Sequence, residues 1–266
     1  MKRLTHDSQV VFNRKIGRGI FHMRLAVKAG IRVKPGQFIN LLVSDSYDPL
    51  LRRPFSVFDA SEKSIDIVYS AIGRATFLMS RKIKGESLNF TGPRGNSYID
   101  FITPGMKKTL FIVVGGGTGA ASANYLAKWL RRAGMRLKLI QGAASKGLLI
   151  KAGEFCKKGV LFSTDDGSAG IKGFATDIVK KAASVDSVVF ACGPKPMLGA
   201  LKKAVPKGTR VFVSLEEYMG CGIGACVSCV TPVKVKNAGT KRVKNSFEYK
   251  RVCVDGTVFE LDELVL

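Results

Sequence analysis

The sequence predicts an antiparallel β-barrel, followed by a doubly wound parallel sheet and a small cysteine-rich C-terminal segment. Three changes of pattern support this prediction. Up to about residue 100, short alternating apolar runs are broken by turn residues, as in antiparallel barrels. From about residue 108, apolar strands alternate with helical segments, which is typical of parallel sheets. Beyond residue 215, cysteines and glycines gather in one short stretch.

The first region, expected over residues 1–102, carries the strands of the barrel. Its apolar runs lie at 10–12, 23–27, 38–43 and 65–69. Glycines and prolines between the runs supply the turns, and a further turn at Gly73 opens a helix predicted over 76–81. The boundary to the next region is expected in the Thr-Pro-Gly loop at 103–105, because such residues end regular structure.

The second region, expected over residues 103–214, begins with an apolar strand at 110–114 and a glycine turn. A helix is predicted from 120 to 132, where Gly134 stops it. Strands at 137–140, 160–162, 188–191 and 211–214 then alternate with helices at 174–183 and 196–204. This alternation predicts a parallel sheet of the dinucleotide-binding kind.

Two motifs at the carboxyl edge of this sheet predict a nicotinamide dinucleotide site. The turn at 115–119 departs from the strict Gly-x-Gly-x-x-Gly pattern, but it lies between a strand and a helix, where phosphates can approach the helix N-terminus. A plain turn without a ligand is the alternative. Cys192, followed by Gly193, ends a later strand and either touches the nicotinamide or is a small buried residue. The stretch 142–146 has no arginine for the phosphate of NADP, so NAD is modestly preferred, with Lys146 keeping NADP as the alternative. The usual ribose-binding acid is also missing there.

A third motif, Arg-Arg-Pro-Phe-Ser-Val at 52–57, predicts a pyrophosphate and ring-binding strand in the first region. A guanidinium fork suits a pyrophosphate, and Ser56 can hydrogen-bond a flat polar ring. The helix after Gly73 would bind the other side of that pyrophosphate through its free N–H groups. A solvated edge strand and an ordinary capped helix are the alternatives. His6 and His22 lie near no other catalytic-looking group, so no catalytic residue is predicted.

Four cysteines near the C-terminus predict an iron–sulfur cluster over residues 215–266. Cys221, Cys226 and Cys229 are separated by four and two residues, and Cys253 follows after a long gap. Plant-type [2Fe-2S] ferredoxins use this arrangement, and interspersed glycines suit a loop that wraps a cluster. A zinc site or disulfides are the alternatives, but zinc ribbons usually present two Cys-x2-Cys pairs and this chain has one.

The charge of the chain is strongly positive, with 43 Lys and Arg against 20 Asp and Glu, a net charge of +23. The basic residues are spread along the sequence, so a generally basic surface is favoured over a nucleic-acid or membrane partner. No apolar run reaches the roughly 18 residues that span a bilayer, and no signal peptide is visible, so a cytoplasmic protein is expected. A local excess is predicted to face a partner protein: Lys234, Lys236, Lys241, Arg242, Lys244, Lys250 and Arg251.

Together these motifs resemble the ferredoxin-NADP reductase superfamily and, within it, the electron-transfer subunits of dihydroorotate dehydrogenase B. The match runs nearly end to end. It rests on the stretch at 52–57, the glycine turn, Thr-Asp-Asp-Gly-Ser at 164–168, Cys-Gly-Pro at 192–194 and the cysteine loop. The cysteine loop is the most discriminating of these.

The resemblance implies FAD on the barrel, NAD on the parallel sheet and a [2Fe-2S] cluster on the last segment. The FAD residues are expected to be Arg53, Pro54, Phe55, Ser56, Tyr69, Ser70, Ala71, Gly73, Ala75 and Thr76, with Ala75 in a place where the family usually has glycine. The NAD residues are expected to be Gly115, Gly116, Gly117, Thr118, Gly119, Cys192 and Gly193. The cluster ligands are expected to be Cys221, Cys226, Cys229 and Cys253.

The resemblance also implies an activity and a partner. Electrons would pass from the FMN of a dihydroorotate-oxidising subunit through the cluster and FAD to NAD+, in pyrimidine (UMP) biosynthesis, within a heterotetramer of two plus two subunits. FAD is expected between the other groups because nicotinamide takes a hydride and a cluster takes one electron at a time. The nearest alternative is the same kind of subunit in a sulfite reductase, hydrogenase or bifurcating oxidoreductase. A basic zinc-bearing nucleic-acid-binding module is the alternative of a different class.

Overall fold

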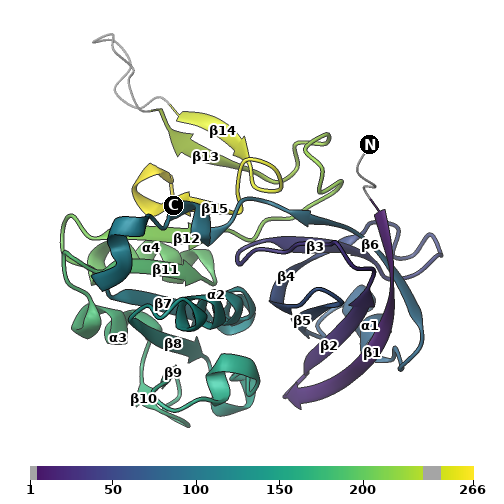
Figure 1. The fold of residues 1–266 in the computed structure, drawn as a ribbon, viewed down its shortest axis with the longest axis horizontal. Helices are drawn as coiled ribbons and strands as arrows, with labels where there is room; N and C mark the ends of the chain where they lie inside the picture. The colour runs from purple at the N-terminus through teal and green to yellow at the C-terminus, as the bar shows by residue number, and fades with distance from the viewer. Residues whose placement is uncertain (1–4, 236–246) are drawn as a thin grey trace.

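The computed structural model describes residues 5–235 and 247–266. In Figure 1, a barrel lies beside a sheet covered by helices, and a short hairpin extends above them. The described strands form a closed six-stranded barrel, a seven-stranded sheet and a two-stranded sheet. The predicted fold class is confirmed.

The barrel is antiparallel, with strand order β1-β2-β5-β4-β3-β6. Alternate residues such as Met23, Leu25 and Ile67 fill its core, so the period-two pattern of the sequence corresponds to inward and outward side chains. Between β5 and β6, a short helix packs Ala75 and Met79 onto this core. The elements are β1 (Thr5–Gly17), β2 (Ile20–Val27), β3 (Phe38–Leu42), β4 (Arg53–Ala60), β5 (Ser64–Ser70), α1 (Arg74–Ser80) and β6 (Ser87–Arg94).

The sheet has strand order β10-β9-β8-β7-β11-β12-β15 and is parallel except for β15. Along β7, Phe111 and Val113 face α2, whereas Ile112 and Val114 face α3 and α4, so helices cover both sides. The strand order reverses at β7, which places the expected ligand crevice between β7 and β11. The elements are β7 (Phe111–Gly116), α2 (Ala120–Arg132), β8 (Leu137–Ala143), β9 (Leu161–Thr164), β10 (Ile171–Lys172), α3 (Ala175–Ala182), β11 (Val188–Cys192), α4 (Lys195–Ala204), β12 (Arg210–Ser214) and β15 (Val258–Glu260).

The C-terminal segment forms the hairpin of β13 (Val230–Lys234) and β14 (Phe247–Arg251), and then returns to the sheet as β15. The return is tied to the barrel, because Asn96 and Val258 exchange two hydrogen bonds of 2.8 Å. Thr257 also donates to the carbonyl oxygen of Gly36 at 2.7 Å. The last segment therefore joins the two larger parts. Short 3-10 turns lie at Tyr98–Phe101, Pro104–Lys108, Gly117–Gly119, Lys146–Leu148, Gly153–Cys156 and Leu261–Glu263.

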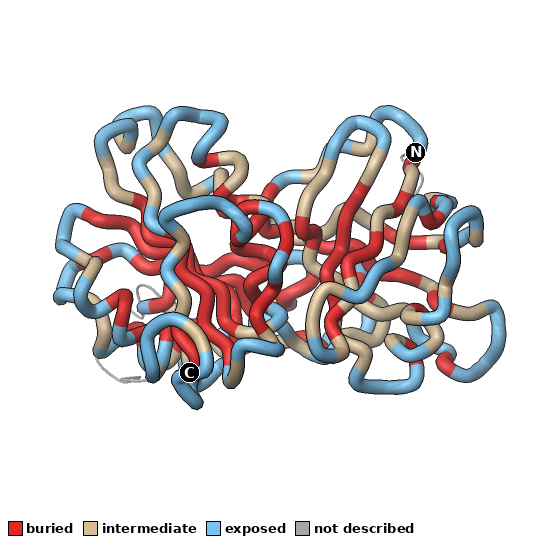
Figure 2. Tube along the Cα trace, turned by 90° about the horizontal axis from the view of Figure 1, so that it is seen from below, coloured by how far each residue is buried: buried red, intermediate tan, exposed pale blue. Residues whose placement is uncertain are grey.

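The barrel and the sheet are held together mainly by α2. Asn124 donates from Nδ2 to the carbonyl oxygen of Phe58 on β4, at 2.8 Å. Tyr125 donates to the carbonyl oxygen of Val33 at 2.9 Å, and Lys128 pairs with Asp59. In Figure 2, buried residues follow the strands of both parts, while the connecting loops are exposed. Across the described ranges, no helix is long and apolar enough to cross a membrane.

Candidate functional site

A cavity of about 640 Å³ opens between the barrel and the sheet. The barrel contributes residues of β4 and β5 and Thr76 of α1, and the sheet contributes the turn after β7, the start of α4 and the segment after β12. The lining includes Phe38, Pro54, Phe55, Ser56, Tyr69, Ser70, Thr76, Thr118, Ala121, Lys195 and residues 215–219. The structure thus brings the Arg-Pro-Phe-Ser motif and the glycine turn to one cavity.

The barrel wall of this cavity is aromatic. The rings of Phe55 and Tyr69 meet edge to face with 5.9 Å between centroids, and Phe21 stacks on Tyr69 at 5.7 Å. The Tyr69 hydroxyl donates to Oδ1 of Asn13 at 3.0 Å, and burial raises the pKa of Tyr69 well above its ordinary value. Tyr69 is therefore neutral, and this wall suits a flat, partly apolar ring.

The remaining residues predicted for FAD lie outside the lining of the cavity. Arg53 donates from Nη1 to the carbonyl oxygen of Leu51 at 2.6 Å, and the methyl group of Ala75 is buried in the barrel core. At the start of α1, the Thr76 hydroxyl accepts hydrogen bonds from the N–H groups of Ile72 and Gly73, at 3.0 and 3.1 Å. This turn is therefore capped internally, and pyrophosphate binding by Gly73 and its neighbours, including Ala71, stays a prediction.

The glycine turn after β7 combines close packing with one open position. A Cβ on Gly115 would lie 2.4 Å from Cα of Ala120, and one on Gly119 would lie 2.6 Å from the backbone of Cys192. Gly116 and Gly193 both face Met197, at 2.5 and 2.6 Å from the position of a Cβ. Close packing against neighbouring atoms therefore accounts for the glycines at these four positions. Gly117 differs, because its φ is +55° and a Cβ there would meet nothing within 4 Å, which leaves its backbone accessible to a phosphate.

An acidic residue that the sequence reasoning missed lies where the cavity meets the sheet. Glu216 lines the cavity just beyond β12, and Cys192 at the end of β11 donates from Sγ to Glu216 Oε1 at 3.8 Å. Burial raises the pKa of both the Glu216 carboxyl and the Cys192 thiol. Burial therefore favours the protonated, neutral form of each group. The available signal was the position of Glu216 directly after an apolar strand, at the carboxyl edge of the sheet. Beside it, Glu217 pairs with Lys195.

The loop between β12 and β13 directs its backbone toward the cysteine sulfurs. The N–H groups of Ile223, Ala225 and Cys226 lie 3.4, 3.3 and 3.3 Å from Sγ of Cys221. The N–H group of Cys221 in turn donates to Sγ of Cys226 at 3.3 Å. Hydrogen bonds from the hydroxyl and the backbone of Ser228, together with those from Cys221, lower the pKa of the Cys226 thiol to about 6. Such donors stabilise thiolates, which are the form that binds metal.

The four thiols of the cysteine motif form two pairs. Cys221 and Cys226 are joined by the hydrogen bonds of the loop, and the thiol of Cys253 interacts with that of Cys229. The second pair is buried, and all six cysteines of the chain are free. Within the described residues, no three His, Cys, Asp or Glu side chains are grouped to hold one metal ion. Two pairs match the ligand set of a two-iron cluster, in which each iron takes two thiolates.

The basic residues near the loop that the structure describes form ion pairs or hydrogen bonds with neighbouring groups. Arg251 pairs with Asp255 at 3.2 Å and donates to the carbonyl oxygen of Gly224 at 3.2 Å. Lys250 pairs with Glu248 at 2.8 Å, and Lys234 donates to the carbonyl oxygen of Asp262 at 2.9 Å. These contacts brace the hairpin and the cysteine loop. The other predicted members of the basic surface lie outside the described residues: Lys236, Lys241, Arg242 and Lys244.

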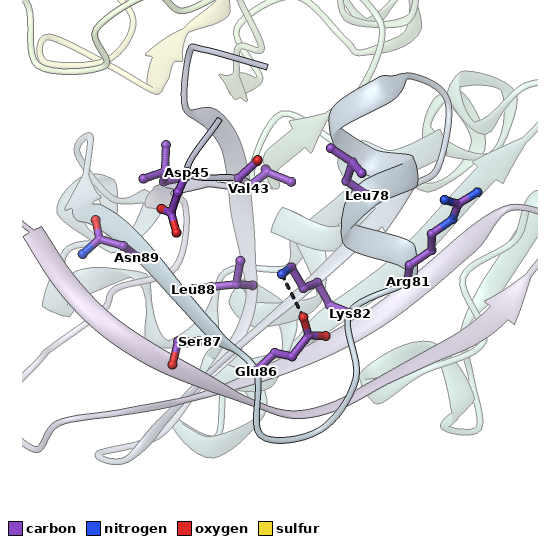
Figure 3. Close-up of a pocket in the computed structure, with 11 residues that line it drawn as sticks. Val43, Asp45, Leu78, Arg81, Lys82, Glu86, Ser87, Leu88 and Asn89 are labelled. Atoms are coloured by element: carbon purple, nitrogen blue, oxygen red, sulfur yellow. Dashed lines mark hydrogen bonds and ion pairs between the residues drawn. The ribbon is translucent and has the colours of Figure 1, made fainter. Parts of the chain in front are cut away.

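A second cavity of about 440 Å³ lies elsewhere on the barrel, between the end of α1 and the start of β6 (Figure 3). Lys82 and Glu86 form an ion pair of 2.9 Å within it. None of the residues predicted for FAD, NAD or the cluster lines this cavity. The chemistry predicted from the sequence therefore belongs to the larger cavity and the cysteine loop.

Comparison with known proteins agrees with this arrangement. Residues 216–265 match the family described as the iron-sulfur cluster binding domain of dihydroorotate dehydrogenase B. The chain is 38% identical over 262 residues to the dihydroorotate dehydrogenase B (NAD(+)) electron transfer subunit of Geobacillus sp. (strain WCH70), covering 97% of both chains. It is 37% identical over 267 residues to the corresponding homolog of Aquifex aeolicus (strain VF5), covering 98% of both.

Solved structures give the same fold. A chain of the NADH-dependent reduced ferredoxin-NADP oxidoreductase is 28% identical, with a TM-score of 0.79 over 97% of this chain and 89% of that one. The ferredoxin reductase in carbazole 1,9a-dioxygenase is 23% identical, with a TM-score of 0.62 over 76% of this chain and 67% of that one. The second likeness shows the fold alone.

Proposed function

This chain belongs to the family of electron transfer subunits of dihydroorotate dehydrogenase B, and from that premise we propose that it carries electrons from a catalytic, dihydroorotate-oxidising subunit to NAD+. One observation supports the proposal most directly. Residues 215–219 line the cavity between barrel and sheet, and Cys221 follows two residues later in the same segment. A single stretch of backbone thus joins the cavity to the paired thiols.

The described residues fit the three groups that such a subunit needs. The two thiol pairs would hold a [2Fe-2S] cluster, the walls formed by residues 54–56 and 69–70 would hold the flavin of FAD, and the open turn at Gly117 and Thr118 would hold the phosphates of NAD. When bound, FAD supplies the exchange between single electrons and a hydride. The larger cavity, of about 640 Å³, has room for a flat ring system.

The chain itself holds the two walls of the cavity in place and determines which charges lie along them. The contacts of α2 with β4 keep the two walls of the cavity at a fixed separation. Burial raises the pKa of the Glu216 carboxyl, which favours its neutral form in the wall of the cavity. The ion pair of Lys195 and Glu217 places one further charge of each sign at the wall. This function requires the chain to align its bound groups, and it requires no acid–base residue of the chain.

We place the catalytic subunit over the cysteine loop, in a heterotetramer of two plus two subunits. Large apolar side chains are exposed around the loop, including Tyr218, Ile223, Val227 and Val254. Exposed apolar groups beside a metal site favour a protein interface there. The proposed compartment is the cytoplasm, since six free cysteines suit a reducing environment.

The proposal is tested by producing the chain together with an FMN-containing dihydroorotate dehydrogenase subunit and purifying the complex anaerobically. We expect a stable complex containing FAD, iron and sulfide, which reduces NAD+ when dihydroorotate is added. The absorbance of NADH measures the reaction. A complex that contains the cofactors and forms NADH only with another electron donor would contradict the partner, and a colourless chain containing zinc would contradict the whole proposal.

A further inference from the structure

Asn40 is a buried amide without a hydrogen-bond partner. It lies in the middle of β3 with 0% of its surface exposed, and neither Nδ2 nor Oδ1 has a partner among the residues that the structure describes. Leaving a buried polar group unpaired is energetically costly, because it loses its hydrogen bonds to water. Such groups are rare in folded proteins, so a missing partner points to a group that binds there.

The side chain of Asn40 lies on the outer face of the barrel, next to the larger cavity. Ile39 and Leu41 fill the barrel core, so Phe38 and Asn40 point to the other side of β3. Phe38 lines the cavity. Asn40 lies two residues further along β3 and pairs with Pro54 of β4, which also lines the cavity.

Asn40 also touches the cysteine loop. A Cβ on Gly222 would lie 2.4 Å from Nδ2 of Asn40, and the φ of Gly222 is +66°. In Figure 1, the segment between β12 and β13 passes over β3 and β6, in agreement with this contact. Gly222 directly follows Cys221, whose sulfur receives the N–H groups of the loop. The amide therefore lies between the thiol-bearing turn and the cavity.

We propose that Asn40 is a positioning residue for the iron–sulfur cluster, and that its Nδ2 donates a hydrogen bond to a sulfide of the cluster. The inference rests on the cluster proposed above. The loop supplies backbone donors to Cys221, and Asn40 adds a side-chain donor from the barrel. Hydrogen bonds to the sulfurs make a cluster easier to reduce. Asn40 would thus tune the cluster from the strand that also lines the cavity.

The test is an anaerobic redox titration of the loaded complex, followed by electron paramagnetic resonance. Asn40→Leu removes the donor while keeping the number and branching of the side-chain heavy atoms. We expect its cluster to be about tenfold harder to reduce, which for one electron corresponds to a fall of 59 mV in midpoint potential. The resonance of the reduced cluster should shift, while the midpoint potential of FAD stays unchanged.

Thr91→Val is the matched control. Thr91 faces Asn40 in the register of β3 with β6, and its hydroxyl is likewise buried without a partner. This variant should leave the cluster potential unchanged. If Asn40→Leu does not fold, Asn40→Ser replaces it: the shorter donor should give a smaller fall of the same sign.

Three outcomes would overturn the inference: an unchanged cluster potential in the Asn40 variant that folds, a shift confined to FAD, or an equal shift in Thr91→Val. Each of these outcomes can be told apart from a failure of the proposed function. If the proposed function were wrong, the unsubstituted chain itself would lack iron and sulfide or would not pass electrons from dihydroorotate to NAD+.

Discussion

Burial shifts the pKa values of two side chains beside the larger cavity. The Glu216 carboxyl and the Cys192 thiol both have raised pKa values, and each lies against the other. A neutral pair is less costly to bury than a carboxylate, so folding favours the protonated form of Glu216. The stability of the chain should therefore depend on pH through Glu216.

Replacement of Glu216 by glutamine should remove this dependence. Because the folded pKa is raised, the stabilisation by the carboxyl is fully present below its ordinary value of 4.5 and is lost as pH rises through the folded value. We therefore expect the wild-type free energy of unfolding to fall relative to that of Glu216→Gln as pH rises above 4.5. Denaturant titrations at several pH values measure the difference.

A matched control for this prediction is Glu248→Gln, since Glu248 is exposed and pairs with Lys250 on the hairpin. Its effect should be within about 0.5 kcal/mol, as for other surface substitutions. A difference between wild type and Glu216→Gln that does not change with pH would contradict a buried, protonated Glu216.

Among the elements, α2 has the largest role in joining the two halves of the cavity. Asn124 serves two buried backbone groups, because it donates to the carbonyl oxygen of Phe58 and accepts from the N–H group of Glu154 at 2.6 Å. Asn124→Ala leaves both without a partner, at about 1–3 kcal/mol each. We expect a loss of about 2–6 kcal/mol in the free energy of unfolding, measured by chemical denaturation of the loaded chain.

The same helix offers a control in Lys128→Ala. Lys128 pairs with Asp59 across the same boundary, but both side chains are partly exposed. Ion pairs in such positions contribute about 0.2–1 kcal/mol. If the two substitutions were equally destabilising, the buried hydrogen bonds of Asn124 would not be what holds the barrel against the sheet.

Elements with a local signal could be predicted from the sequence, and those that depend on distant contacts could not. The helix predicted over 120–132 has these bounds in the structure because its apolar face and its glycine stop are local features. β15 is only three residues long and owes its existence to pairing with β12. The helix expected over 76–81 begins at Arg74 instead, since Thr76 caps the turn from within.

The candidate site shows the same division. The cysteine spacing and the Arg-Pro-Phe-Ser motif indicated chemistry directly, because each residue type is needed for its ligand. Asn40 and Glu216 carry no such signal. Asn40 is a single polar residue in an apolar strand, and only the fold reveals that Gly222 packs against it. Which polar residue faces a site is decided by tertiary contacts between segments far apart in the sequence.

At the scale of the whole molecule, the thiol pairs and the larger cavity are two separate sites of one chain. Cys226 of the cysteine loop is exposed to solvent. Arg251 stabilises the loop by donating a hydrogen bond to the carbonyl oxygen of Gly224. The barrel wall of the cavity has its own core and shares no residue with the cysteine motif. Loss of one ligand in the loop should therefore leave the cavity intact.

Cys226→Ser tests this separation. We expect NADH formation driven by dihydroorotate to fall by at least about a hundredfold, since removal of a metal ligand strongly impairs the site. FAD content and the reduction of an artificial dye by NADH should stay within about twofold of wild type, because the walls of the cavity are built from other elements. Both activities and the flavin absorbance are measured on the same preparation.

Cys156→Ser is the matched control, because Cys156 is exposed and lies outside the cluster motif. It should leave both activities unchanged. Simultaneous loss of FAD and dye reduction in Cys226→Ser would mean that the cysteine loop also shapes the cavity, through residues 215–219 that lead into it. The cysteine loop and the cavity would then be one structural unit, and a substitution in the loop could not separate their electron-transfer steps.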